Sequence, residues 1–560
     1  MEETIVSIIK DHYETSRSKI FCKFIKEGKY SNITYENLVA NSNNYAAHFI
    51  DAGIKKGDVV LIILKHCPDL FYSFIGSMMI GAIPSILPFP SEKQDINLYR
   101  DSIEKLSKLI GAKSIVTYRE NLNEAENIKK HIEMDIITPE DIRKVNSGIK
   151  WEKSCYITKN DVAFLQHSSG TTGLKKGVAL SHVSVLNQIE KYSKTIGLNK
   201  NDIIVSWLPL YHDMGLIACF IMPLIKKIPV VKIDPFEWVN EPSMLLREIN
   251  DNKGTLCWLP NFAYNFLSSC IDDESEKYDL SSIRAIINCS EPCKLHSHDV
   301  FYEKFKSYGI TRESLQTCYA MAENVFAITQ SELGKIVRAD YVDKNYFSEK
   351  HIAKKTKNEN EESISFLSVG QIIQNTRIKI VDDKRKELPE RHVGEIAVSS
   401  NSLFSGYFKL EKESKAVLEN GWLYTGDMGY FADGELYITG RKKDIIIIHG
   451  KNYYMHDIEC IANNVHGIKK GRCVAIGVYN DAIGSEEAAL IAETSAEDLN
   501  EKRKIASNIK LNVNKELNLV ISDVYLVPLK WIVKTTSGKI SRSENKRKYL
   551  REKFGIGEAD

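Results

Sequence analysis

The chain has 560 residues, of which 43% are hydrophobic and 27% charged, an ordinary composition for a folded protein. This length predicts about two to four domains and excludes a peptide or a disulfide knot. The 75 basic and 74 acidic residues leave a net charge of +1, so no nucleic-acid partner is expected. The 11 cysteines include no C-x-x-C pair, which favours a reducing compartment, and we expect the cytoplasm.

Two segments bear on membrane attachment. The N-terminal stretch MEETIVSIIKDHYE places acidic residues among apolar ones, which predicts a short amphipathic helix rather than a secretory signal. Residues 70–90 carry no charge and are numerous enough to span a bilayer. Gly81, Pro84 and Pro88 interrupt this stretch, so we expect a buried helix followed by a buried strand, and no membrane span.

Short runs rich in Val and Ile alternate with amphipathic segments through residue 289, which predicts a parallel α/β fold. The strand candidates are DVVLIILK, PSILPF, SIVTYR, DVAFLQHS, DIIVSWLP, PVVKID, GTLCWLP and IRAIINCS. Beyond Glu323 the pattern changes. Residues 349–362 are highly charged and predict a solvated excursion, while TRIKIVDD, GEIAVSS, GELYITG and DIIIIHG predict a smaller antiparallel sheet. Residues 445–560 predict a compact α+β terminal domain.

A polar loop follows the apolar run DVAFLQHS. Its hydroxyls, glycines and lysine are Ser168, Ser169, Gly170, Thr171, Thr172, Gly173 and Lys176. Glycines let backbone N–H groups converge, hydroxyls add donors and the lysine adds charge, which together suit a polyphosphate. The loop is followed by a helix whose apolar face carries Val185 and Tyr192, with Ser181 as the N-cap and Gly197 as the terminator. The spacing does not match a Walker loop, and a flexible polar linker is the alternative.

This loop resembles the phosphate loop of the adenylate-forming superfamily, and further motifs match that family in order. They are WLPLYHDMGL at 207–216, NCSEP at 288–292, YAMAE at 319–323, GWLYTGD at 421–427, GRKKD at 440–444 and TTSGK at 535–539. The resemblance implies a large N-terminal domain, residues 1–442, of two stacked α/β subdomains plus a small β-barrel-like subdomain. It also implies a small mobile α+β C-terminal domain, residues 443–560, that swings about a hinge at Lys443.

The resemblance implies ATP and Mg²⁺ as cofactors and assigns roles to single residues. Tyr319 would stack on adenine, Glu323 would hold Mg²⁺, Asp427 would accept from the ribose hydroxyls, and Arg441 would approach the ribose and phosphates. The remaining expected nucleotide-binding residues belong to the same two adenine motifs: Ser290, Glu291 and Pro292, and Ala320, Met321 and Ala322. The alternative for each charged residue is an ordinary solvated or paired surface charge.

Lys539 resembles the catalytic lysine of the family, and with Glu323 it is expected to act in catalysis. Its ammonium would bridge the substrate carboxylate and the α-phosphate while charge moves toward pyrophosphate. An ionised carboxylate already attacks phosphorus, so neither a general base nor a covalent enzyme intermediate is needed.

Two other clusters suggest different chemistry. Cys289, Cys293, His296 and His298 lie within ten residues, but their spacing is not a standard zinc pattern. His212 and Asp213 are adjacent in sequence and seldom form a catalytic dyad, so His212 is expected to line the substrate pocket.

Several segments resemble fatty acyl-AMP ligases more than CoA ligases: WLPLYHDMGL, PNFAYN with Asn261 and Phe262, and GKNYYMHDIE. The interval from Glu323 to Gly370 is longer than in CoA ligases. In fatty acyl-AMP ligases extra sequence here packs on the terminal domain and disfavours CoA. We therefore expect a fatty acid substrate, contacted by His212, Asn261 and Phe262, and a carrier-protein phosphopantetheine thiol as acceptor.

The alternatives are an acyl-CoA synthetase and a non-catalytic nucleotide-binding homologue. The sequence departs from the family pattern at Lys175, Ala320 and Met455, and the first two changes could alter the loop or the pocket.

Overall fold

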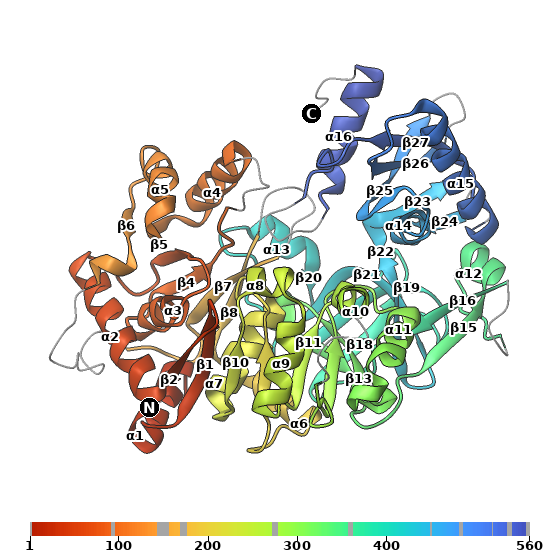
Figure 1. Cartoon of the computed structure of the whole chain (residues 1–560). Helices are drawn as coiled ribbons and strands as arrows, with labels where there is room; N and C mark the ends of the chain where they lie inside the picture. The colour runs from red at the N-terminus through yellow and green to blue at the C-terminus, as the bar shows by residue number, and fades with distance from the viewer. Residues whose placement is uncertain are drawn as a thin grey trace.

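The computed structural model describes residues 3–90, 96–142, 156–168, 176–271, 278–356, 362–448, 451–480, 485–517, 519–534 and 540–555. It is an α/β protein with a large N-terminal domain and a smaller C-terminal domain, which lies at the upper right of Figure 1. The N-terminal helix α1 (Ile5–Ser16) is amphipathic and packs its buried residues Ile5 and Ile9 on the main core, as its sequence predicts.

One sheet of the large domain has the strand order β6-β5-β3-β4-β7-β8 and is parallel except for the β7-β8 pair. Its strands are β3 (Val59–Ile63), β4 (Ile83–Ile86), β5 (Ala112–Thr117), β6 (Asp135–Ile137), β7 (Val162–Ser168) and β8 (Lys176–Ser181). The helices of this region are α2 (Tyr35–Asp51), α3 (Asp69–Met79), α4 (Ile96–Ile110) and α5 (Leu122–Lys129).

The uncharged stretch from residue 70 forms helix α3 and buried strand β4, so the prediction for it is confirmed. Gly81 takes a φ of 72° where the chain turns from helix to strand, a conformation that glycine adopts without strain. Among the described residues, no helix combines the length and the apolar character that a membrane crossing requires.

The second sheet has the strand order β17-β14-β13-β12-β11-β9-β10-β1-β2, parallel in its centre and antiparallel at both edges. Its strands are β1 (Ile20–Lys26), β2 (Lys29–Thr34), β9 (Ile204–Ser206), β10 (Val230–Lys232), β11 (Leu256–Leu259), β12 (Ala285–Asn288), β13 (Leu315–Ala320), β14 (Ala327–Gln330) and β17 (Gln371–Ile372). The helices are α6 (His182–Thr195), α7 (Met222–Lys226), α8 (Pro235–Asn240), α9 (Ser243–Asn252), α10 (Asn261–Cys270) and α11 (Leu295–Phe305). A continuous hydrophobic core joins the two sheets.

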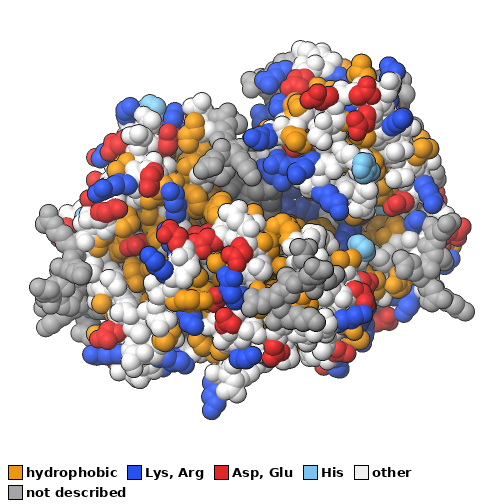
Figure 2. Space-filling model, in the orientation of Figure 1, with side chains coloured by type: hydrophobic (Ala, Val, Ile, Leu, Met, Phe, Trp, Pro, Cys, Tyr) orange, Lys and Arg blue, Asp and Glu red, His pale blue; other side chains and the backbone are white. Residues whose placement is uncertain are grey.

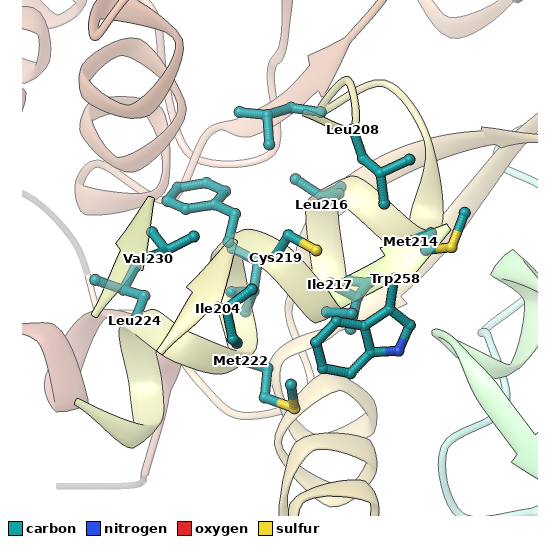
Figure 3. Close-up of a cluster of buried hydrophobic side chains, with 14 of the residues drawn as sticks. Ile204, Leu208, Met214, Leu216, Ile217, Cys219, Met222, Leu224, Val230 and Trp258 are labelled. Atoms are coloured by element: carbon teal, nitrogen blue, oxygen red, sulfur yellow. The ribbon is translucent and has the colours of Figure 1, made fainter. Parts of the chain in front are cut away.

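A π-helix, η4 (Met214–Ile221), runs through the centre of this core. Figure 3 shows its side chains among those of β9, α7, β10 and β11. The helix packs so closely on the preceding turn that a Cβ on Gly215 would lie 2.1 Å from the carbonyl oxygen of Pro209. Glycine is therefore required at position 215 by contact with backbone, which cannot move aside as a flexible side chain can.

We expect Gly215→Ala to lower the melting temperature of the protein clearly. Overpacking of a core typically costs about 1–3 kcal/mol. Thermal unfolding followed by circular dichroism measures the change. Gly177→Ala is the control, because a Cβ there would meet nothing closer than 3.4 Å. Equal melting temperatures for the two variants would contradict the close contact at Gly215.

The third region of the large domain is antiparallel, as the sequence predicts. Its main sheet has the order β18-β19-β21-β20, with β22 also paired to β21, and beside it lies the two-stranded antiparallel sheet β15-β16. The elements are β15 (Ala339–Asp343), α12 (Lys344–Lys350), β16 (Ser363–Leu367), β18 (Thr376–Val381), β19 (Gly394–Ser400), α13 (Glu411–Val417), β20 (Leu418–Glu419), β21 (Trp422–Ala432) and β22 (Glu435–Arg441).

The prediction of a solvated excursion at 349–362 holds for most of the part that the structure describes, where the charged side chains are exposed, but not for all of it. Ala353 is fully buried, and Arg391 donates to its carbonyl oxygen at 2.9 Å. Ile352 forms a bridge with His392. The backbone is thus paired inside the subdomain while the charged side chains point outward, and composition alone does not distinguish that arrangement from a loop. Residues 357–361 lie outside the described residues.

The described residues of the C-terminal domain form a hairpin, a three-stranded sheet and three helices, as expected for an α+β unit. Its elements are β23 (Ile445–Ile448), β24 (Lys451–Tyr454), α14 (Met455–Asn463), β25 (Ile468–Asn480), β26 (Ser485–Thr494), α15 (Leu499–Leu517), β27 (Ile521–Val527) and α16 (Arg542–Phe554). Helices α14 and α15 contribute to one hydrophobic cluster and α16 to another, so both faces of its sheet are covered. In Figure 2, Lys and Arg side chains gather where this domain faces the larger one.

Candidate active site

The buried side chain of Asp427 is the centre of a polar cluster between β13 and β21. Tyr319 donates its phenol proton to Asp427 Oδ2 at 2.7 Å, and Arg441 Nε donates to Oδ1 at 3.0 Å. The β21-β22 register fixes the arginine, since Asp427 pairs directly with Arg441. Burial and the neighbouring carboxylate raise the pKa of Tyr319, so the phenol remains a donor. Asp427 attracts the Arg441 guanidinium and raises its pKa. The predicted residues for adenine, ribose and phosphate are therefore in direct contact.

Glu323 lies in the short helix η7 (Ala322–Asn324) and is only 8% exposed. Burial raises the pKa of its carboxyl, and a hydrogen bond from Tyr407 opposes that shift. The Tyr407 Oη–H donates to Glu323 Oε1 at 2.9 Å. Lys176 places its ammonium 4.7 Å from the centre of the same tyrosine ring. Tyr407 could not be predicted from the sequence, because it lies 84 residues from Glu323 and belongs to none of the motifs quoted above.

The polar loop connects two antiparallel strands rather than a strand and a helix. Ser168 ends β7, Lys176 begins β8, and the two residues pair in register. The predicted helix is present as α6, with Ser181 accepting from the Ser184 N–H at 3.2 Å, but β8 precedes it. Most of the loop lies outside the described residues. This applies to the side chain of Ser168, to Lys175 and to the predicted residues Ser169, Gly170, Thr171, Thr172 and Gly173.

The second adenine segment follows β12, the parallel neighbour of β13. Asn288 pairs with Thr317, so Ser290 and Tyr319 emerge at the same edge of the sheet. Ser290 takes a φ of 68°, which turns the chain sharply there. Glu291 accepts from the Phe262 N–H at 2.9 Å, and Pro292 is exposed. On the other segment, Ala320 and Met321 are partly buried and Ala322 is buried.

The three residues predicted to contact the substrate have different neighbours in the structure. His212 precedes the π-helix and its ring lies 5.2 Å from that of Tyr211. Phe262 is 47% exposed and packs edge-on to Trp207, their ring centres 6.2 Å apart. Asn261 accepts from the Asn288 side chain at 2.9 Å and donates to Ser297 Oγ at 3.1 Å, so its amide already ties α10 to α11.

The zinc candidates have other partners. His298 stacks on Tyr264 with ring centres 5.0 Å apart, and its Nε2 lies 3.2 Å from the Asn288 side-chain nitrogen. Throughout the described parts of the chain, no three His, Cys, Asp or Glu side chains are grouped to hold a metal ion. A magnesium ion that uses one carboxylate and several phosphate oxygens needs no such group. Glu323 is buried, and Tyr407 donates a hydrogen bond to one of its two carboxylate oxygens. This carboxylate fits that kind of ion.

Two of the predicted site residues are lysines of the C-terminal domain, Lys443 and Lys539. Lys443 lies in η8 (Lys442–Asp444), directly between β22 and β23. Burial removes water from the Lys443 ammonium, and to a smaller extent the positive charge of Arg441 repels it. Together they lower the pKa of Lys443 to about 8. Lys539 lies outside the described residues. The residues that flank its segment, Lys534 and Ile540, form a bridge with each other.

The described residues of the two domains meet at several places, one of them the pair of hydroxyls of Thr439 and Tyr454, which lie 2.9 Å apart. Lys294, before α11, forms an ion pair with Asp457 of α14 at 3.1 Å. The interval between Glu323 and Gly370 supplies a further contact. Glu349 of α12 pairs with Lys451 at 2.8 Å, and Phe347 lies 6.2 Å from the ring of Tyr454 in a shared hydrophobic cluster. The interval therefore packs against the C-terminal domain, as predicted.

Comparison with known proteins agrees with this geometry. Residues 10–408 match the model of the family described as "AMP-binding enzyme". The "medium-chain-fatty-acid--[acyl-carrier-protein] ligase JamA" of Moorena producens is 28% identical over 98% of this chain and 95% of its own length. A "putative acyl-CoA synthetase" of Caulobacter vibrioides is also 28% identical, over 93% and 91%.

Among solved structures, one from a study of the fatty acyl-adenylate ligases of E. coli and L. pneumophila matches with a TM-score of 0.90 and 26% identity, over 99% of both chains. A fatty acyl-adenylate ligase of L. pneumophila in complex with acyl adenylate and pyrophosphate matches with a TM-score of 0.75 and 28% identity, over 98% and 96%. Motifs, fold and clustered polar residues agree, and the chain therefore belongs to the AMP-binding enzyme family of adenylate-forming ligases.

Proposed function

We propose that the protein is a fatty acyl-AMP ligase. It joins a fatty acid to the AMP part of ATP with release of pyrophosphate, and then passes the acyl group to the phosphopantetheine thiol of an acyl carrier protein. The observation that carries this proposal is the interval from Glu323 to Gly370, which is packed on the C-terminal domain through Glu349, Phe347 and their partners. The whole-length likeness to fatty acyl-adenylate ligase structures supports it. We place the reaction in the cytoplasm.

In the first step the fatty carboxylate attacks the α-phosphorus, a C–O–P bond forms, and the bond to the pyrophosphate oxygen breaks. Tyr319 and the Ser290 turn would hold adenine, Asp427 the ribose, and Lys176 with the loop that precedes it the phosphates. Mg²⁺, when bound at Glu323, would neutralise charge on the phosphate oxygens. Lys539 would bring a cation to the carboxylate and the α-phosphate. Positioning and charge neutralisation then provide the catalysis.

Pyrophosphate release across fatty acids of graded chain length tests the first step. Incubation of the product with CoA or with a carrier protein tests the second. We expect transfer to the carrier protein and little to CoA. Efficient thioester formation with CoA would instead establish the acyl-CoA synthetase. Nucleotide binding with no turnover of any acid would establish the non-catalytic homologue.

Lys451→Glu tests directly whether the contact of the Glu323–Gly370 interval with the C-terminal domain excludes CoA. Like charges at Glu349 and position 451 would then repel, where the ion pair now contributes up to about 1 kcal/mol. We expect acyl-CoA formation to rise up to about fivefold relative to adenylation, as the contact loosens. Lys469→Glu, on an exposed part of β25, controls for the change of charge. An unchanged ratio in the Lys451 variant would contradict a role of this contact in excluding CoA.

Asp427→Asn tests the nucleotide cluster. The amide loses the charge that holds Arg441, and hydrogen bonds to charged groups contribute about 1.5–3 kcal/mol. We expect ATP to bind roughly 10- to 100-fold more weakly by calorimetry. Asp523→Asn is the matched control, because Asp523 accepts from Tyr549 and pairs with Lys553 in the C-terminal domain. Equal ATP affinity in the two variants would remove Asp427 from the binding site.

A further inference from the structure

The loop between β19 and α13 lies against the phosphate side of the site. It adds to strand β8 through backbone hydrogen bonds: Ser405 N–H donates to Ala179 at 2.9 Å, and Phe408 N–H donates to Gly177 at 2.7 Å. On its other side, Phe404 N–H donates to the carbonyl oxygen of Glu323 at 2.8 Å. The loop thus fastens the strand that begins with Lys176 to the short helix that carries Glu323.

Tyr407 is held rigidly in this loop. Its N–H donates to Ser414 Oγ at 2.8 Å, and that hydroxyl donates to Leu410 at 2.6 Å. Phe404 packs edge-on against the tyrosine ring, with the ring centres 5.0 Å apart. Backbone pairing, a serine bridge and an aromatic neighbour fix both the position and the tilt of the ring.

The ring and the hydroxyl of Tyr407 contact two different charged groups, the ammonium of Lys176 and the carboxylate of Glu323. The hydroxyl gives a hydrogen bond to Glu323 Oε1, which fixes the rotation of the carboxylate while Oε2 can still accept a cation. The π-face lies 4.7 Å from the Lys176 ammonium, close enough for a cation–π attraction.

We propose that Tyr407 is a positioning residue that sets the carboxylate of Glu323 and the ammonium of Lys176 at a fixed separation for a metal–polyphosphate ligand. The inference rests on the proposed function, because Glu323 and Lys176 receive Mg²⁺ and phosphate only in that reaction. It assigns the hydroxyl to the metal side and the ring to the phosphate side. Substitutions that remove one or both therefore have different effects.

The test measures binding of α,β-methylene-ATP to the full chain by calorimetry, with and without Mg²⁺, for Tyr407→Phe and Tyr407→Leu. Tyr407→Phe keeps the ring, so we expect metal-free affinity to stay within twofold of wild type. The gain in affinity on adding Mg²⁺ should fall about tenfold, as for loss of a hydrogen bond to a charged group. Tyr407→Leu removes the ring as well and should also weaken metal-free binding.

Tyr30→Phe is the matched control. Tyr30 donates to Glu248 Oε1 at 2.7 Å and has the Lys23 ammonium 5.1 Å from its ring centre, the same combination of partners on strand β2. We expect it to leave both affinities unchanged.

A full Mg²⁺ gain in Tyr407→Phe would overturn the inference, and so would equal weakening with and without the metal, which a purely structural role predicts. A wild-type protein that binds the analogue but releases no pyrophosphate with any acid would overturn the proposed function alone. The affinities would then still decide the role of Tyr407.

Discussion

Replacement of Lys539 by alanine is expected to slow adenylation on the order of 10²- to 10³-fold, the usual effect of losing one preorganised charge donor. Negative charge moves from the carboxylate through the α-phosphate to pyrophosphate in this step. A cation brought to the carboxylate and the α-phosphate would neutralise that charge as it develops. The TTSGK segment is the proposed source.

ATP–pyrophosphate exchange with a fatty acid measures the loss. Lys546→Ala, on helix α16 close in sequence to Lys539, is the control for removing a positive charge from the same domain. Exchange at the wild-type rate in Lys539→Ala would remove this lysine from the mechanism.

Lys443→Pro is expected to leave the fold intact and to suppress one half-reaction on the order of 10²-fold, since a reacting group misplaced by about 1 Å can lose that much. Proline fixes φ near −65° and so restricts rotation at this position. Lys443 lies in a three-residue helix between the last strand of the large domain and the first strand of the small one. The backbone there is the proposed hinge between an adenylation and a thiol-transfer arrangement.

The two half-reactions are measured separately, as ATP–pyrophosphate exchange and as acyl transfer from preformed acyl-adenylate to a carrier protein. Lys443→Ala controls for loss of the ammonium and should keep both steps closer to wild type. If both half-reactions proceed unchanged in Lys443→Pro, rotation at this residue is not required.

Much of the fold could be predicted because its signals are local. The parallel strands are continuous apolar runs, and α6 has a serine cap and a terminating glycine. Strand β8 was not predicted. Its sequence KGVALS is short, and what makes it a strand is pairing with β7 across the loop. The π-helix was not predicted either, because its eight residues are all buried and show no amphipathic pattern.

In the candidate site, too, residues of local motifs could be predicted, whereas contacts between distant segments could not. Tyr319, Asp427 and Arg441 belong to motifs, and the structure brings them into contact. Tyr407 lies in a loop that reaches Glu323 from another subdomain, and no pattern in the sequence connects the two. The bonds of the Asn261 amide to Asn288 and Ser297 likewise join distant segments, and the sequence does not indicate them. Contacts between distant segments depend on packing, which sequence periodicity does not encode.

The most direct measurement is the reaction of the purified protein with MgATP and a series of fatty acids, without any thiol, followed by pyrophosphate assay and mass spectrometry of the products. The account predicts that at least one acid yields acyl-adenylate and pyrophosphate in equal amounts. Failure to consume ATP with any acid in the series would contradict it.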